Sequence, residues 1–210
     1  MRFSAEMLRL YAVTDRRWLG ERTLPEAVEA AIRGGVSCVQ LREKELDPAD
    51  ILNEAKLLLN ICRSSGVPLI INDNPEIALA CGADGVHVGQ KDMSARILRA
   101  MLGPEKIVGV SAATPEEARQ AVKDGADYLG SGAVFATGTK ENTRPVDAAL
   151  LREICAASAV PVVAIGGITA ENAPLLKDTG IAGIAVVSAI FAQPDPEQAA
   201  AHLRKIAEGL

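Results

Sequence analysis

Short apolar runs alternate with amphipathic segments along the chain. The runs are at most six residues long and rich in Val and Ile. This pattern predicts the buried strands of a parallel sheet covered by helices. The predicted strands are 8–13, 38–41, 67–71, 85–88, 107–110, 128–129, 162–165 and 184–187. The predicted helices between and after them are 24–33, 48–64, 75–81, 95–102, 115–124, 147–156, 170–177 and 196–208.

Eight strand–helix pairs with short connections fill the 210 residues. This spacing predicts an α/β fold in which residues 1–210 form a single (β/α)8 barrel (TIM barrel) domain. A doubly wound open sheet is the alternative, because periodicity does not give the order of the strands.

Helix starts support this division of the chain independently. Four predicted helices begin at a proline that follows a capping side chain: Asp47, Asn74, Thr114 and Asp195. Proline is favoured there because the N–H it lacks would have no partner within the helix. Thr23 and Glu26 also have the spacing of a capping box.

Composition narrows the classes of function. With 22 basic and 27 acidic residues the net charge is -5, which argues against a nucleic-acid or anionic-membrane binder. The absence of a long apolar run and of a signal-like start predicts a cytoplasmic protein. The cysteines are widely spaced without a Cys-x-x-Cys pair, so neither a zinc site nor a disulfide framework is indicated. They are Cys38, Cys62, Cys81 and Cys155.

Polar residues gather at the carboxyl ends of the predicted strands. In a parallel barrel these ends meet on one rim, where barrel enzymes carry their chemistry. The residues are Thr14 and Asp15; Gln40, Arg42, Glu43 and Lys44; Asn72 and Asp73; Gln90 and Asp92; Ser111; Ser131, Thr137, Thr139 and Lys140; Gly166 and Gly167; and Ser188.

Several of these residues have a competing structural interpretation. Asp73 could cap a helix, although Asn74 stands directly before Pro75 and suits that role better. Asp92 could cap the helix that starts near Ser94, and the Lys and Arg side chains could be solvated surface charges. The two histidines, His87 and His202, give no triad or metal cluster.

Two phosphate sites follow from the remaining residues. The cations Arg42, Lys44 and Lys140 beside the carboxylates Asp73 and Asp92 suit a Mg²⁺–polyphosphate. Separately, "AIGGIT" and "VVSAI" follow the last two predicted strands, where many barrels cradle a monophosphate on backbone N–H groups. Such a pair of sites suits a transferase that joins a diphosphate substrate to a monophosphate substrate.

The motifs "YAVTD", "VQLREKEL", "IIND", "ADGVHVGQKD", "GADYLGSGAVFATGTK" and "VPVVAIGGIT" occur in this order along the chain. In this the chain resembles the thiamine-phosphate synthase family. The resemblance implies a barrel enzyme that couples a hydroxymethylpyrimidine diphosphate to a hydroxyethylthiazole phosphate, with Mg²⁺ as cofactor. It implies a dissociative mechanism, in which pyrophosphate leaves before the thiazole nitrogen attacks. Self-association into a homo-oligomer is compatible with a barrel of this size.

Site roles carry over by position. The resemblance implies that Asp73 and Asp92 hold Mg²⁺. The implied diphosphate and pyrimidine residues are Gln40, Arg42, Lys44, Asn72, Ser111 and Lys140, of which Arg42, Lys44, Ser111 and Lys140 would act in catalysis. The implied thiazole-phosphate residues are Thr137, Thr139, Gly167, Val187 and Ser188.

The chain departs from the pattern of many relatives at three positions. Ala113 stands where they have His, and Ala133 and Ala136 stand where they have Pro. Two alternatives stay open at this point: an isomerase of the thiazole-tautomerase kind and a non-catalytic phosphate-ligand binder. The complete diphosphate set and the lost His favour the synthase over the isomerase.

Overall fold

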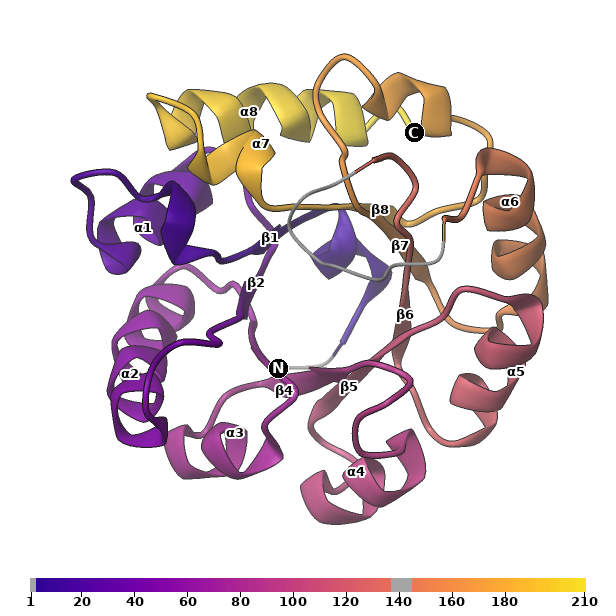
Figure 1. The fold of residues 1–210 in the computed structure, drawn as a ribbon, viewed down its shortest axis with the longest axis horizontal. Helices are drawn as coiled ribbons and strands as arrows, with labels where there is room; N and C mark the ends of the chain where they lie inside the picture. The colour runs from indigo at the N-terminus through magenta and orange to yellow at the C-terminus, as the bar shows by residue number, and fades with distance from the viewer. Residues whose placement is uncertain (1–2, 137–144) are drawn as a thin grey trace.

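The computed structural model describes residues 3–136 and 145–210. Its centre is a closed barrel of parallel strands in sequence order, so β1 pairs with both β2 and β8 (Figure 1). The strands are β1 Leu10–Val13, β2 Cys38–Leu41, β3 Leu69–Asn72, β4 Gly85–Val88, β5 Ile107–Ser111, β6 Tyr128–Ser131, β7 Val162–Ile165 and β8 Gly183–Val186. This closure confirms the predicted (β/α)8 barrel and excludes the open sheet.

Helices surround the ring of strands (Figure 1). They are α1 Leu24–Arg33, α2 Pro48–Ser64, α3 Pro75–Cys81, α4 Ala95–Leu102, α5 Pro115–Lys123, α6 Ala148–Ala157, α7 Ser188–Phe191 and α8 Pro196–Ala207. The short 3-10 segments η1 Ala5–Leu8 and η2 Arg16–Trp18, and the short helix α7, were not predicted from the sequence.

The predicted helix 170–177 is wrong. The structure has only the 3-10 turn η3 Ala173–Leu176, with Pro174 near its start. Proline fits the first turn of a helix but would clash with a carbonyl four residues earlier, so no helix can run through it from Ala170. The Asn172 side chain instead bonds back to the Thr169 N–H and the Gly167 carbonyl.

Most predicted caps are present. Asn74 accepts the Ile77 N–H at 2.9 Å, Thr114 accepts the Glu117 N–H, and Asp195 accepts two N–H groups of α8. Thr23 and Glu26 form the reciprocal capping box. Asp47 is the exception, since its side chain makes no cap bond to α2. A cap of this kind stabilises a helix by about 1 kcal/mol.

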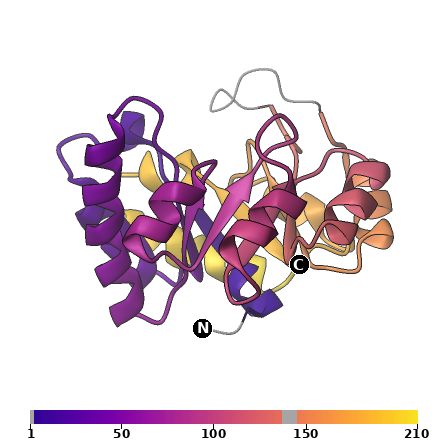
Figure 2. The same ribbon diagram turned by 90° about the horizontal axis from the view of Figure 1, so that it is seen from below.

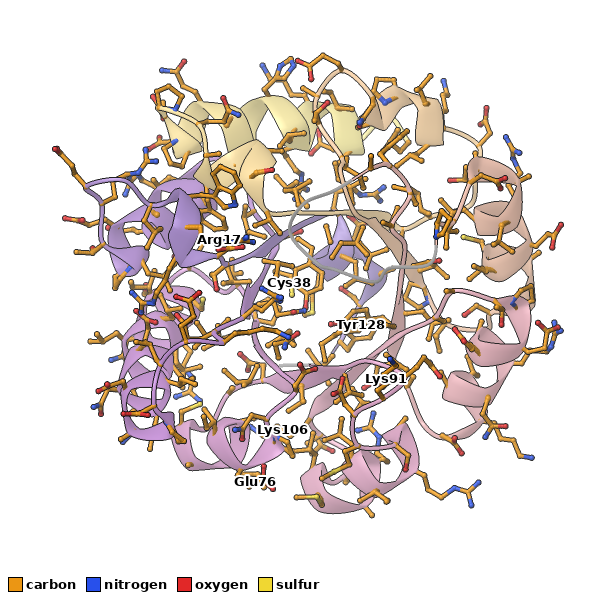
Figure 3. All side chains as sticks on the ribbon, viewed as in Figure 1. Arg17, Cys38, Glu76, Lys91, Lys106 and Tyr128 are labelled. Atoms are coloured by element: carbon orange, nitrogen blue, oxygen red, sulfur yellow. The ribbon has the colours of Figure 1, made fainter. Side chains whose placement is uncertain are left out.

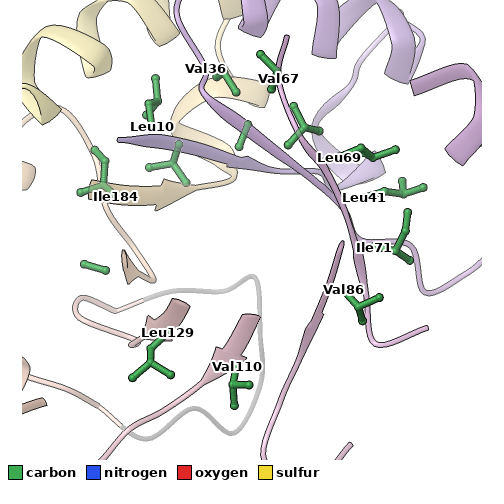
Figure 4. Packing of buried hydrophobic residues seen from close by; sticks show 14 of the residues in the cluster. Leu10, Val36, Leu41, Val67, Leu69, Ile71, Val86, Val110, Leu129 and Ile184 are labelled. Atoms are coloured by element: carbon green, nitrogen blue, oxygen red, sulfur yellow. The ribbon is translucent and has the colours of Figure 1, made fainter. Parts of the chain in front are cut away.

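Alternation along the strands builds two apolar layers. Leu10, Leu41 and Leu69 belong to the outer layer, between strands and helices (Figure 4). Tyr128 and Cys38 lie inside the ring of strands, in a second cluster that fills the lumen (Figure 3). Each fully buried leucine of the outer layer contributes about 2 kcal/mol of transfer free energy.

One end of the lumen is closed by the start of the chain. Leu8 of η1 is buried in the lumen cluster, and the ring of Phe3 stacks on Tyr128 with centroids 6.0 Å apart. The indigo η1 lies below the barrel in Figure 2, away from the strand ends that carry the polar residues. The plugged end therefore leaves the opposite rim for chemistry.

Candidate active site

The loop after β3 is held in an unusual conformation. Asp73 has φ 61°, in the left-handed region that L-residues other than Asn and Asp rarely adopt. Its backbone N–H donates to the His87 carbonyl at 2.8 Å, and the Asn72 amide donates to its carboxylate at 2.6 Å. Asn74 caps α3 as predicted, so Asp73 has no capping task and is turned toward the rim.

Two carboxylates from different loops meet here. The Asp92 carboxyl lies within hydrogen-bonding reach of Asp73. Burial first, and then the Asp92 charge, raise the pKa of Asp73, while the Asn72 amide and Lys44 act in the opposite direction. Two adjacent acids with too little neutralising charge around them are suited to a bound cation.

Asp92 does not cap a helix. Its carboxylate accepts the Gly89 N–H at 2.8 Å, which folds the β4 loop back on itself, and Ser94 is the residue that precedes α4. The competing structural interpretation of Asp92 is therefore wrong. The loop geometry points the acid at Asp73 instead.

Of the two cations of the β2 loop, Lys44 lies beside this acid pair, and Arg42 lies near Thr14 and Asp15. Lys44 lines a pocket of about 320 Å³ together with Asn72 and Asp73. The Arg42 charge helps to lower the pKa of Asp15, after the larger effect of Arg17. Neither Arg42 nor Lys44 forms an ion pair within residues 3–136 and 145–210, which leaves both for an anionic ligand.

A chain of hydrogen bonds crosses the lumen under the rim. The Gln40 amide donates to the Tyr11 hydroxyl at 2.8 Å, and the Tyr11 and Tyr128 hydroxyls are 2.8 Å apart. His87 Nδ1 is 3.0 Å from the Tyr128 hydroxyl, and His87 Nε2 is 3.0 Å from Ser111 Oγ. When each group donates one hydrogen bond to the next, starting from the Gln40 amide, His87 Nε2 donates to Ser111 Oγ. The Ser111 hydroxyl can then donate its own hydrogen bond to a ligand.

Sequence reasoning missed the middle of this chain. Burial raises the pKa of Tyr11 and of Tyr128 well above the usual value, so both stay protonated donors. Gly109 is required opposite them, because an added Cβ would lie 2.2 Å from Tyr128 Cζ. Strand alternation was the available signal, since Tyr11, His87 and Tyr128 share the inward face with Gln40 and Ser111.

The loops after β7 and β8 form a different surface. Gly167 has φ 63°, and a Cβ there would meet the Ala136 carbonyl oxygen at 2.3 Å. The glycine is therefore needed for close packing against the β6 loop as well as for any phosphate contact. Val187 precedes the short helix α7, which begins at Ser188 with N–H groups that have no partner within the helix.

Three predicted site residues, Thr137, Thr139 and Lys140, lie outside the described residues. The other predicted site residues lie at or just after the carboxyl ends of the strands, on one rim. Two of the positions that depart from the pattern of many relatives can be placed as follows. Ala113 donates its N–H to the Glu117 carboxylate at 2.7 Å, and Ala133 is buried.

The acid pair fits a magnesium ion whose other ligands are not protein side chains. Within residues 3–136 and 145–210 no three His, Cys, Asp or Glu side chains surround one point as a metal cage would. Two carboxylates with phosphate oxygens and waters are a usual Mg²⁺ environment in phosphate-handling enzymes. Asp73 and Asp92 match that pattern.

A family model, a curated relative and a solved structure point to the same family. The sequence model described as "Thiamine monophosphate synthase" matches residues 10–190. A thiamine-phosphate synthase of Ruminiclostridium cellulolyticum is 51% identical over 197 residues, covering 94% of each chain. The structure of a thiamine phosphate pyrophosphorylase from Pyrococcus furiosus superposes with a TM-score of 0.90 at 38% identity, covering 97% of each chain.

A plant relative is much longer. A chloroplastic thiamine biosynthetic bifunctional enzyme of Arabidopsis thaliana is 54% identical over 198 residues, which are 91% of this chain and 38% of the relative.

Among the helices that the structure describes, none combines the length and the apolar character needed to span a bilayer. The family match over most of the chain is decisive: this protein belongs to the thiamine monophosphate synthase family.

Proposed function

We propose that the chain is a thiamine-phosphate synthase. It would couple 4-amino-2-methyl-5-hydroxymethylpyrimidine diphosphate to 4-methyl-5-hydroxyethylthiazole phosphate, giving thiamine phosphate and pyrophosphate. The single observation that carries the proposal is the meeting of Asp73 and Asp92 beside Lys44 at the rim. An enzyme acting on the thiazole phosphate alone would have no use for this acid pair.

The diphosphate would bind between the loops after β2, β3 and β4. Asp73 and Asp92 would hold Mg²⁺, which supplies positive charge to the diphosphate oxygens when bound. Arg42, Lys44 and the Asn72 amide would contact the same oxygens, as would Lys140 from the sequence pattern. The Ser111 hydroxyl, which is held in place by His87, would donate a hydrogen bond to the leaving group and keep its proton.

The pyrimidine would sit over the lumen, between Gln40 and Ser111. The thiazole phosphate would take the other side of the rim, on the backbone near Gly167, Val187 and Ser188, with Thr137 and Thr139. This arrangement places the two substrates face to face over the end of the barrel.

The reaction would be dissociative. The bond between the methylene carbon and the bridging oxygen breaks, pyrophosphate takes the electron pair, and the aminopyrimidine stabilises the cation left behind. The thiazole nitrogen then supplies its lone pair to that carbon. No proton has to be removed from the nucleophile, so the rate depends on stabilising the leaving charge and on positioning.

The purified chain with both phosphorylated precursors and Mg²⁺ provides the test. We expect thiamine phosphate and pyrophosphate in equal amounts, and loss of product when Mg²⁺ is replaced by a chelator. Absence of product at high enzyme concentration contradicts the proposal. Conversion of the thiazole phosphate alone to an isomer would instead support the isomerase, and binding without conversion the ligand-binding paralogue.

A further inference from the structure

Glu43 stands between the two cations of the β2 loop, yet its side chain does not serve as a ligand group. It lines the pocket beside Lys44 and Asp73, and its side chain is only 5% exposed. A buried carboxylate near an acid pair could be read as a third metal ligand. Its hydrogen bonds show a different use.

Both oxygens of the Glu43 carboxylate are engaged by the protein. Oε1 accepts the backbone N–H of Lys44 at 2.9 Å and that of Glu45 at 3.3 Å. Oε2 accepts Nε of Arg16, which comes from η2 after β1. The carboxylate therefore ties the backbone that carries Lys44 to a neighbouring loop.

Arg16 is itself anchored. Its Nη2 pairs with Glu54 of α2, whose side chain is 12% exposed, so the guanidinium bridges two largely buried acids. Charge-assisted bonds of this kind are stronger and more directional than neutral ones, and Arg is suited to two partners at once. The bridge fixes the β2 loop from outside the pocket.

Thr14 holds the other side of the same loop. Its N–H donates to the Gln40 carbonyl at 3.0 Å, and its hydroxyl accepts the Arg42 N–H at 3.0 Å. The β1 loop thus holds the β2 segment at Gln40, Arg42 and Glu43. Thr14 and Glu43 are predicted rim residues for which the proposed reaction gives no role.

We propose that Glu43, clamped by Arg16, is a positioning residue that holds Lys44 in register with the acid pair for the diphosphate. This rests on the proposed function. A lysine on a free loop would lose side-chain and backbone entropy on every binding event, and the clamp removes part of that cost in advance.

The test compares Glu43→Ala with Glu54→Ala. Both variants remove one partner of Arg16, but only the first releases the Lys44 backbone. We expect Glu43→Ala to raise KM for the pyrimidine diphosphate about tenfold with KM for the thiazole phosphate unchanged, and Glu54→Ala to stay within about twofold. Equal rises for both substrates would overturn the proposal.

A double-mutant cycle separates positioning from a general loss of structure. If Glu43 acts through Lys44, Glu43→Ala adds less than about twofold once Lys44→Ala is present, whereas independent effects multiply. The Mg²⁺ concentration for half-maximal rate should not change in Glu43→Ala. A shift as large as that in Asp73→Asn would make Glu43 a metal ligand and overturn the proposal.

Two further measurements keep the result interpretable. If Glu43→Ala does not fold, Arg16→Gln breaks the clamp from the rim side and should give the same selective rise, with Arg16→Lys restoring part of the loss. If the unmodified chain makes no thiamine phosphate, the proposed function fails, and calorimetry with inorganic pyrophosphate and Mg²⁺ still tests Glu43. Equal pyrophosphate affinity in the unmodified chain and in Glu43→Ala would then overturn the proposal that Glu43 positions Lys44.

Discussion

The two halves of the rim handle charge in opposite ways. The half built by the loops after β2, β3 and β4 uses side chains: Lys44, Asn72, Asp73 and Asp92 meet around one pocket edge. The half built after β7 and β8 uses backbone, with Gly167 in a left-handed conformation and the start of α7. The proposed reaction has a use for side chains in the first half, because a metal ion and a leaving group would have to be stabilised there.

The difference also appears in how each half is fixed. The acid–cation half is held by bonds to side chains. The Arg16–Glu43 bond joins two loops, and the Asn72–Asp73 bond lies within one loop. The backbone half is held by backbone bonds, such as that from the Phe135 N–H to the Gly166 carbonyl, and by close packing, with no space for a Cβ at Gly167. Loss of a charge should therefore damage chemistry in one half, while added volume should damage binding and folding in the other.

The acid pair should give the largest effect. Asp73→Asn keeps a residue that tolerates φ 61° and removes one of the two charges proposed to hold Mg²⁺. We expect kcat/KM for coupling to fall about 1,000-fold or more, as for other losses of charge stabilisation. Steady-state assays at saturating Mg²⁺ provide the measurement.

Asp178→Asn is the matched control for this variant. Asp178 has φ 62° but is exposed in the segment before β8, away from the β2–β4 loops, so its activity should be unchanged. Normal turnover in Asp73→Asn would show that the acid pair does not carry the reaction and would remove the contrast between the two halves.

Lys44→Ala should come next. The substitution removes a cation that forms no ion pair in the described part of the chain, so the loss falls on the ligand. We expect kcat/KM with respect to the diphosphate to fall about 100-fold while KM for the thiazole phosphate changes little. Lys56→Ala on exposed α2 is the control, and equal changes for both substrates would contradict the division of the rim.

Gly167→Ala tests the backbone half. The added Cβ would lie 2.3 Å from the Ala136 carbonyl oxygen in a left-handed conformation, so the loops after β6 and β7 must separate. We expect KM for the thiazole phosphate to rise about tenfold and the free energy of unfolding to fall by about 2–3 kcal/mol.

Gly66→Ala measures how much of that loss of stability comes from backbone strain alone, without close packing. Gly66 has φ 69° with nothing within 4 Å of an added Cβ, so it should lose only about 1 kcal/mol of backbone strain. Unfolding in urea, followed for both variants, gives the difference. An equal loss in the two would mean that close packing at Gly167 does not matter.

The sequence predicted the fold and the position of Lys44, Asn72 and Asp73 on the rim, whereas the roles of these residues stay predictions. Helix starts at Pro75 and Pro115 were readable because a capping side chain and proline act locally, within one turn. Asp73 could be assigned to the rim because Asn74 already explained the helix start. The one wrong helix, 170–177, came from an apolar pattern that ignored Pro174.

The parts that sequence did not predict all depend on contacts between loops or across the lumen. Arg16 and Glu43 are 27 residues apart, and no local pattern says that their loops touch. The bonds from Tyr128 to Tyr11 and His87 require the barrel to be closed first. Barrel topology predicts which residues reach the rim, but it does not say which of them pair.

The smallest expected effect concerns stability. The same Asp73 charge that the proposed reaction needs should destabilise the folded chain. The raised pKa of Asp73 means that the folded chain holds this proton more tightly than the unfolded chain, so stability falls as pH rises from the usual carboxyl range through the raised value. At neutral pH without Mg²⁺, Asp73→Asn should therefore raise the free energy of unfolding by about 1 kcal/mol, since it removes a partly buried charge and its repulsion from Asp92. The gain should vanish in acid, where Asp73 is protonated in the unmodified chain, and Mg²⁺ should stabilise only that chain. Urea unfolding at several pH values measures this, and a gain independent of pH would mean that the Asp73 charge does not destabilise the fold.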